Sequence, residues 1–146
     1  MKQPLTIGFI GLGLIGGSIA KAIRYYYPDT RIIAHTRSQA TIDYALNEQI
    51  IDIACDQVDA RFSECDYIFL CAPVEANASY LEILKSLIQP GCILTDVGST
   101  KTDIHTHVAD LGLESQFIGG HPMAGSEKTG IANAKRHLLE NAYYIV

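Results

Sequence analysis

The chain has 146 residues, of which 48% are hydrophobic and 18% charged, and its formal net charge is −5 at pH 7. This composition predicts one globular domain with a substantial core and excludes a disordered chain. The negative charge argues against a nucleic-acid surface, which requires clustered Lys and Arg. No apolar run approaches the length of a membrane span, and the N-terminus leads into an expected strand without the apolar segment of a signal peptide.

The cysteines are spaced neither as metal ligands nor as a CxxC redox pair; they are Cys55, Cys65, Cys71 and Cys92. Two of them lie in apolar, strand-like runs, so we expect them to be small buried hydrophobic residues in a reducing compartment. We therefore expect a cytoplasmic protein without a metal site.

The first half of the chain alternates apolar runs with helical periodicity. Residues 5–10 form an apolar run that predicts a buried strand. From Ile15 apolar residues recur every fourth position, which predicts a helix that stops near Pro28. Residues 31–35 predict a second strand, and Ser38 is a suitable N-cap for the helix that follows.

The second half repeats this alternation. The expected elements are a strand at 67–71, a helix through 81–88, a strand at 92–95, a helix opened by residues 98–101, a strand at 117–119, a helix near 131–140 and a strand-like end at 143–146. Strands that are apolar on both faces and alternate with helices predict a mostly parallel sheet covered on both sides. The expected fold is therefore α/β, doubly wound and Rossmann-like.

A glycine-rich turn joins the first expected strand to the first helix, a context typical of dinucleotide binding. Gly11 permits the tight turn, Gly13 lets a pyrophosphate approach the backbone, and Gly16 allows close packing of helix and strand. The alternative is a glycine-rich turn that binds nothing. We expect a dinucleotide.

The start of that helix supplies the remaining phosphate contacts. The backbone N–H groups of Leu14 and Ile15 are expected to face the phosphates, whose negative charge the helix dipole favours. We therefore expect residues 1–146 to form one dinucleotide-binding domain. Because the sequence stops within an apolar, strand-like segment, we also expect it to be the N-terminal domain of a longer protein.

The residues after the second expected strand bear on the choice of cofactor. NAD enzymes usually place Asp or Glu there to hold the ribose hydroxyls. Here the sequence is Thr36-Arg37-Ser38, and no acid occurs before Asp43. An arginine between two hydroxyl residues suits the 2′-phosphate of NADP. We expect these three residues to contact the cofactor, with NADP favoured and NAD as the alternative.

Two further turns are expected at the carboxyl edge of the sheet, where open α/β sheets bind ligands. Ala72-Pro73-Val74 would line the cofactor with backbone and apolar atoms, unless it is an ordinary strand-to-helix turn. The second turn is residues 96–101, in which Ser99 can contact a ligand or cap the next helix. Lys101 would oppose the dipole of that helix, so we expect it to contact an anionic ligand or to be a surface lysine.

His121 lies between glycines and a proline, which predicts a loop rather than a helix or strand. Imidazole changes its charge near neutral pH, so a histidine at this place can accept a proton from an alcohol. We interpret His121 as the catalytic base. The other histidines are expected on the surface, outside any metal pair; they are His35, His105, His107 and His137.

At these residues the chain resembles the prephenate/arogenate dehydrogenase family. The matching segments are residues 11–18, 96–101 and 120–127, in the expected order, and the last is specific to the family. Residues 140–144 also resemble the approach to the family's final Rossmann strand. The resemblance implies oxidative decarboxylation of prephenate to 4-hydroxyphenylpyruvate in tyrosine biosynthesis.

The resemblance also implies roles for single residues. His121 would bond the ring hydroxyl of the substrate, Ser99 would orient His121 near the nicotinamide, and Glu127 with Ser126 would shape the substrate pocket. The family's helical domain, expected after residue 146, makes a homodimer and supplies further substrate-binding groups. Without it, the chain is expected to bind cofactor and to be inactive or weakly active.

Three alternatives stay open. An arogenate dehydrogenase would differ only in the side-chain end of its substrate. A β-hydroxyacid dehydrogenase shares the fold and a serine-containing turn but fits the His121 loop poorly. A non-catalytic nucleotide-binding module would need no proton acceptor.

Overall fold

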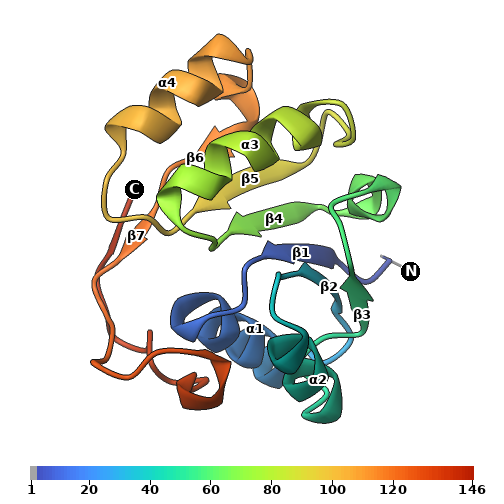
Figure 1. The fold of residues 1–146 in the computed structure, drawn as a ribbon, viewed down its shortest axis with the longest axis vertical. Helices are drawn as coiled ribbons and strands as arrows, with labels where there is room; N and C mark the ends of the chain where they lie inside the picture. Colours follow the sequence, from blue (N-terminus) through green and yellow to red (C-terminus); the bar gives the residue numbers. More distant parts are fainter. Residues whose placement is uncertain (1–2) are drawn as a thin grey trace.

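The centre of the molecule is a six-stranded parallel sheet, seen in a computed structural model that describes residues 3–146 (Figure 1). Its strands lie in the order β3-β2-β1-β4-β5-β6. Their bounds are β1 (Thr6–Ile10), β2 (Arg31–His35), β3 (Ile53–Cys55), β4 (Tyr67–Leu70), β5 (Ile93–Asp96) and β6 (Phe117–Ile118). The strand order reverses between β1 and β4, which leaves a crevice at their carboxyl ends. The expected doubly wound α/β fold is confirmed.

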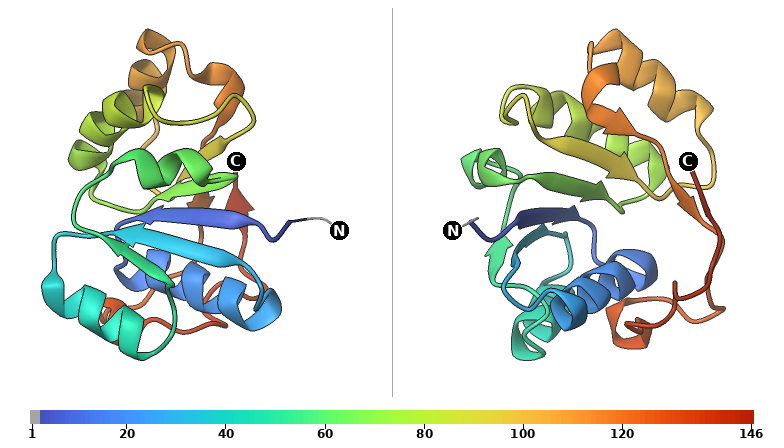
Figure 2. Two further views of the ribbon diagram at one scale, coloured as in Figure 1. Left: turned by 90° about the vertical axis from the view of Figure 1, so that its right-hand side faces the viewer. Right: turned by 180° about the vertical axis from the view of Figure 1, so that it is seen from behind.

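Helices cover both faces of this sheet (Figures 1 and 2). One face carries α1 (Leu14–Tyr26) and α2 (Gln39–Asn47), and the other carries α3 (Val74–Lys85) and α4 (Thr102–Asp110). In the described part of the chain, three short 3₁₀ turns complete the helical elements, at Ala60–Glu64, Glu114–Gln116 and Ile131–Asn133. No helix within residues 3–146 is both long and apolar enough to cross a membrane.

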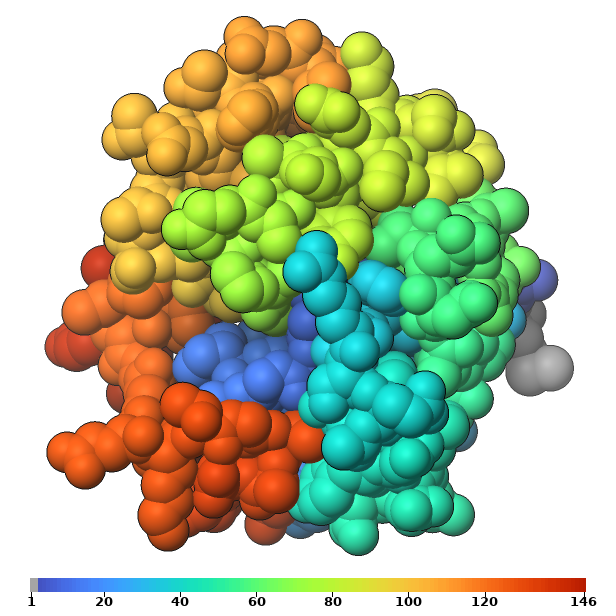
Figure 3. Space-filling view, in the orientation of Figure 1, coloured from blue at the N-terminus to red at the C-terminus, as the bar shows by residue number. Residues whose placement is uncertain are grey.

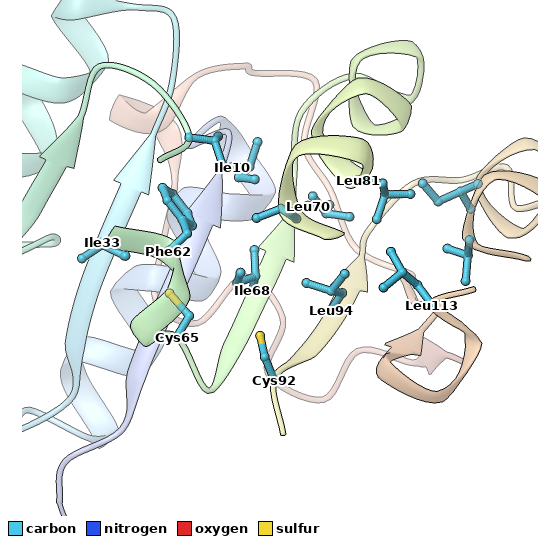
Figure 4. Close-up of a cluster of buried hydrophobic side chains, with 14 of the residues drawn as sticks. Ile10, Ile33, Phe62, Cys65, Ile68, Leu70, Leu81, Cys92, Leu94 and Leu113 are labelled. Atoms are coloured by element: carbon cyan, nitrogen blue, oxygen red, sulfur yellow. The ribbon is translucent and has the colours of Figure 1, made fainter. Parts of the chain in front are cut away.

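Each face has its own buried core, because neighbouring strand residues point to opposite faces. Ile33 and Leu70 belong to the cluster beneath α3 and α4 (Figure 4). Ile32 and Phe9 belong to the cluster beneath α1 and α2. The strands are therefore apolar at successive positions, as the sequence predicted for a sheet buried on both sides.

The segment after β6 forms a separate antiparallel pair, β7 (His121–Pro122) with β8 (Tyr144–Ile145). Between these two strands the chain runs alongside α1, as both views of Figure 2 show. There Lys21 Nζ donates to the Ala134 carbonyl at 2.7 Å, and the Lys135 N–H donates to Ser18 Oγ at 3.0 Å. The chain therefore returns to the carboxyl edge of the sheet only after packing against the helix that begins at the glycine turn.

Several local predictions differ from the structure. The expected helix at 131–140 is wrong, because only Ile131–Asn133 is helical and turns follow. The backbone of this segment is held by the side chains of α1 instead. The expected loop at His121 is a two-residue strand. The short β3 and the turn at Ala60–Glu64 were not predicted.

The two serines considered as helix caps differ in the structure. Ser38 caps α2 as expected, since its side chain accepts from the Thr41 N–H. Ser99 does not cap α4, whose N-cap is Lys101.

All four cysteines are free; three are buried and Cys71 is half-buried. Burial raises the pKa of the Cys92 thiol to about 11, so it is protonated at neutral pH.

Neighbouring residues of α3 provide a test of the core. Leu84 is fully buried, whereas Ile83 is 42% exposed. We predict that Leu84→Ala lowers the free energy of unfolding by about 2–5 kcal/mol, because it leaves a cavity beneath α3. The matched variant Ile83→Ala should change it by about 0.5 kcal/mol. Equilibrium urea unfolding measures both, and equal losses would contradict the placement of α3.

Candidate active site

The glycine turn lies directly after β1, at the crevice between β1 and β4. Gly11 has a φ of 91°, in the left-handed region that favours glycine. A Cβ at this position would lie 2.7 Å from the backbone N of Ala72 and the carbonyl carbon of Cys71. Only glycine therefore fits between the turn and the end of β4.

The two other glycines of the turn have different surroundings. A Cβ at Gly16 would lie 2.6 Å from the Gly11 carbonyl oxygen, so close packing requires glycine there too. At Gly13 a Cβ would meet no atom within 4 Å among the described residues. The outer side of the turn is thus open to a ligand.

This opening faces the N-terminus of α1, where backbone N–H groups have no partner within the helix. Gly13 is the N-cap and makes no side-chain cap, and the first turn carries no acidic residue. The N–H groups of the first turn, including those of Leu14, Ile15 and Gly16, and the helix dipole therefore favour an anion. These features fit the pyrophosphate of a dinucleotide.

A pocket of about 280 Å³ adjoins the turn and extends toward the end of β2. Its lining residues are Gly11, Leu12, Gly13, His35, Thr36, Arg37, Cys71, Ala72, Pro73, Ala76 and Tyr80. Figure 3 shows a hollow whose floor is the blue start of α1, walled by α3, by the cyan segment after β2 and by the orange-red segment that packs on α1. The pocket therefore joins three predicted cofactor-binding segments. Ser38, also predicted, lies at the start of α2 and caps it.

The inner wall of this pocket contains His35, so its expected surface position is wrong. His35 is only 8% exposed. Its Nδ1 lies 3.0 Å from the Cys55 carbonyl oxygen, and its Nε2 lies 3.3 Å from Tyr80 Oη. Because a carbonyl only accepts, Nδ1 donates and Nε2 accepts from Tyr80. His105 and His137 are exposed as expected, and His107 is half-buried.

Burial also affects the thiol next to the glycine turn. Cys71 lies against Gly16, with its Sγ 3.3 Å from where a Cβ of Gly16 would be. Burial raises the pKa of this thiol, and the nearby charge of Asp96 raises it further. Cys71 is therefore a neutral thiol at the crevice.

The second loop at this edge follows β5, and its main polar contact is internal. Asp96 ends β5 and is 2% exposed. Its Oδ2 accepts from Lys101 Nζ at 2.6 Å. The same ammonium group donates to the Gly98 carbonyl oxygen. The Lys101 ammonium is thus bound within the loop, and its contact with an anionic substrate stays a prediction.

The third loop brings His121 to the same edge. The Gly120 N–H donates to Asp96 Oδ1 at 3.1 Å, which fastens this loop to the end of β5. His121 is half-buried, and its Nδ1 lies 3.4 Å from the Val97 carbonyl oxygen. Since Asp96 pairs with Leu70 at the end of β4, His121 lies on the edge of the sheet that carries the glycine turn.

The remaining predicted residues lie on exposed loops. Ser99 borders a hollow between α3 and α4, and no hydrogen bond joins it to His121 in the described structure. Ser126 Oγ accepts from the Lys128 N–H, and Glu127 is exposed. Their contacts with the substrate therefore stay predictions.

Besides His35, two further residues of this region, Asp96 and Tyr80, were not predicted to belong to the site. Asp96 is a charged residue at the end of an apolar strand, a signal that was present in the sequence. Tyr80 lies on α3 in a helical pattern, and nothing in the sequence indicated its contact with His35.

Comparison with known proteins agrees with this geometry. The family model described as the nucleotide-binding domain of prephenate dehydrogenase matches residues 19–146. A prephenate dehydrogenase from Bacillus subtilis is 45% identical over 144 residues, an alignment that covers 97% of this chain and 38% of that protein. The chain thus spans less than half the length of this relative.

Two solved structures share the fold along nearly the whole chain. Arogenate dehydrogenase from Synechocystis is 38% identical with a TM-score of 0.86, covering 96% of this chain and 49% of the other. Prephenate dehydrogenase from Aquifex aeolicus, solved with hydroxyphenyl propionate and NAD⁺, is 27% identical with a TM-score of 0.88 and the same coverage. These matches, together with the glycine turn, show that the chain belongs to the prephenate dehydrogenase family. It corresponds to the nucleotide-binding domain of that family.

Proposed function

We propose that this chain is the cofactor-binding part of a dehydrogenase that decarboxylates prephenate oxidatively to 4-hydroxyphenylpyruvate. The observation that carries the proposal is the placement of His121 and the glycine turn at one edge of the sheet. The carboxyl ends of the neighbouring strands β1, β4 and β5 lie at this edge, so a dinucleotide bound at the turn can extend toward the loop of His121.

The cofactor of the proposal is NADP, with NAD as the alternative. The N–H groups of Leu14, Ile15 and Gly16 would bind the pyrophosphate, and Ala72-Pro73-Val74 would line the dinucleotide. Thr36 and Arg37 lie at the other end of the pocket, where the adenosine ribose would be. When bound, the nicotinamide would supply the acceptor for the hydride that leaves the substrate's ring carbon.

His121 accepts the proton of the ring hydroxyl as that carbon becomes a carbonyl. The bond from the ring to its carboxylate then breaks and CO₂ leaves. The electron pair of that bond makes the ring aromatic and turns the carbonyl oxygen into a phenolate, which takes back the proton held by His121 to give the hydroxyl of the product. Ser99, Lys101, Ser126 and Glu127 are proposed to orient His121 or the substrate. A helical domain outside this chain would complete the pocket and form the homodimer, and the enzyme would work in the cytoplasm.

Arogenate is the second candidate substrate. The support for this candidate is the 38% identity between this chain and the Synechocystis arogenate dehydrogenase. Parallel assays of the full-length enzyme with prephenate and arogenate decide between them through the rate of nicotinamide reduction.

The role of His121 predicts a specific loss. In the full-length enzyme, His121→Asn should lower kcat by about 10²–10⁴-fold, because proton transfer to a positioned base is lost. Nucleotide affinity, measured by fluorescence titration, should change by less than about threefold, since the glycine turn is distant in sequence and unaltered. His137→Asn, at an exposed position, is the control. Turnover near the parent value in His121→Asn would remove this residue from the mechanism.

The role of Arg37 predicts a change in cofactor preference. Arg37→Ala should weaken NADP binding by about 10–100-fold, because a charge-assisted contact with the 2′-phosphate is lost. NAD binding should barely change. Arg136→Ala, which removes another exposed arginine, should affect neither. Dissociation constants for both nucleotides test this, and equal weakening of NADP and NAD would refute it.

A further inference from the structure

We propose that Asp96 is a positioning residue, whose buried carboxylate binds the backbone of the Gly120–His121 loop and so determines where the His121 imidazole lies. Its effect on turnover rests on the proposed function. Its effect on the loop does not.

Three donors from two loops converge on this carboxylate. Oδ2 accepts from Lys101 Nζ at 2.6 Å and from the Gly98 N–H at 3.3 Å. Oδ1 accepts from the Gly120 N–H at 3.1 Å. The β5–α4 loop and the His121 loop are thus held by the two oxygens of one side chain.

The chemistry of this arrangement requires a carboxylate. Asp96 is 2% exposed, and a buried charge is tolerated only when it is paired and hydrogen-bonded. All of its partners are donors. An amide in the same place has one accepting oxygen, and its NH₂ group would face either the Lys101 ammonium or the Gly120 N–H. Asparagine therefore satisfies one loop and repels the other.

The contact at Gly120 matters because little else fixes the His121 side chain. The imidazole Nδ1 lies 3.4 Å from the Val97 carbonyl oxygen, which is long for a hydrogen bond. On its other side Gly120 packs against Tyr144, whose ring lies 2.5 Å from where a Cβ of Gly120 would be. The position of the imidazole therefore follows from its backbone, which pairs with β8 at His121 and Pro122 and is bound by Asp96 at Gly120. A misplacement of about 1 Å at a reacting group can reduce turnover about 10²-fold.

Asp52 offers a control of the same contact type at the opposite edge of the sheet, where its carboxylate is exposed and not buried. Its Oδ2 accepts from Arg24 Nη2 at 2.6 Å and from the Ile32 N–H at 2.7 Å. It therefore binds a cation and a backbone N–H, as Asp96 does, but beside the start of β2. Asp52→Asn removes the same kind of interaction far from His121.

The test compares Asp96→Asn with Asp52→Asn in the full-length enzyme. Amide hydrogen exchange of peptides spanning residues 117–123 should be at least about tenfold faster in Asp96→Asn and unchanged in Asp52→Asn. The kcat of Asp96→Asn should fall about 10–100-fold, while that of Asp52→Asn and the nucleotide affinity of both should stay within about threefold. Unchanged exchange at 117–123 in Asp96→Asn, or unchanged kcat despite faster exchange, would overturn the proposal.

A second measurement covers loss of folding. If Asp96→Asn does not fold, the exchange of the Gly120 amide is measured in the parent enzyme, where its hydrogen bond to Asp96 should slow exchange at least about tenfold relative to an unstructured peptide. An unprotected Gly120 amide overturns the proposal. If the parent enzyme fails to turn over prephenate and arogenate, the proposed function is wrong, and the exchange experiment still decides whether Asp96 holds the loop.

Discussion

The close approach of the glycine turn to the end of β4 determines the geometry of the whole carboxyl edge. At Gly11 a Cβ would lie 2.7 Å from the backbone of Ala72, and at Gly16 it would lie 2.6 Å from the Gly11 carbonyl oxygen. Any side chain there would push α1 away from β4. Without one, the N-terminus of α1 lies beside the β4–α3 loop, so the free N–H groups of the helix face the crevice that this loop borders.

Strand-end aspartates secure the rest of the sheet, which is apolar on both faces and polar only at its edges. At the amino edge, Asp66 Oδ2 accepts from the Thr6 N–H at 2.8 Å, and Asp52 accepts from the Ile32 N–H. At the carboxyl edge, Asp96 accepts from the Gly120 N–H. Asp66 and Asp52 are exposed, and they hold the starts of β1 and β2. Asp96 is nearly fully buried, because the loops it joins cover it.

The fold could be predicted where it depends on local pattern, and it could not where it depends on distant partners. The apolar runs of β1, β2, β4 and β5 showed burial on both faces directly. The expected helix after Ile131 failed because its apolar spacing resembles a helix, while the Ala134 carbonyl is bound by Lys21. His35 was placed outside because histidine is polar. Its partners, Cys55 and Tyr80, lie 20 and 45 residues away in sequence.

The same distinction separates the two halves of the candidate site. The glycine turn lies within residues 11–16, so its glycine spacing predicts it, although the need for glycine at position 11 comes from Cys71 and Ala72. The surroundings of His121 depend on Asp96, 24 residues from Gly120, and no spacing rule connects them.

Two histidines lie at the carboxyl edge, His35 buried and His121 half-buried, and their ring nitrogens favour the proposal that His121, not His35, transfers the proton. Both ring nitrogens of His35 have partners, at 3.0 Å and 3.3 Å, so its imidazole has no free lone pair. In residues 3–146, the His121 ring has one hydrogen-bonding neighbour, the Val97 carbonyl oxygen, which lies 3.4 Å from Nδ1. Nε2 therefore stays available to a substrate hydroxyl. A base needs a fixed backbone and a free nitrogen, and the loop at Gly120 combines the two by binding the main chain instead of the ring.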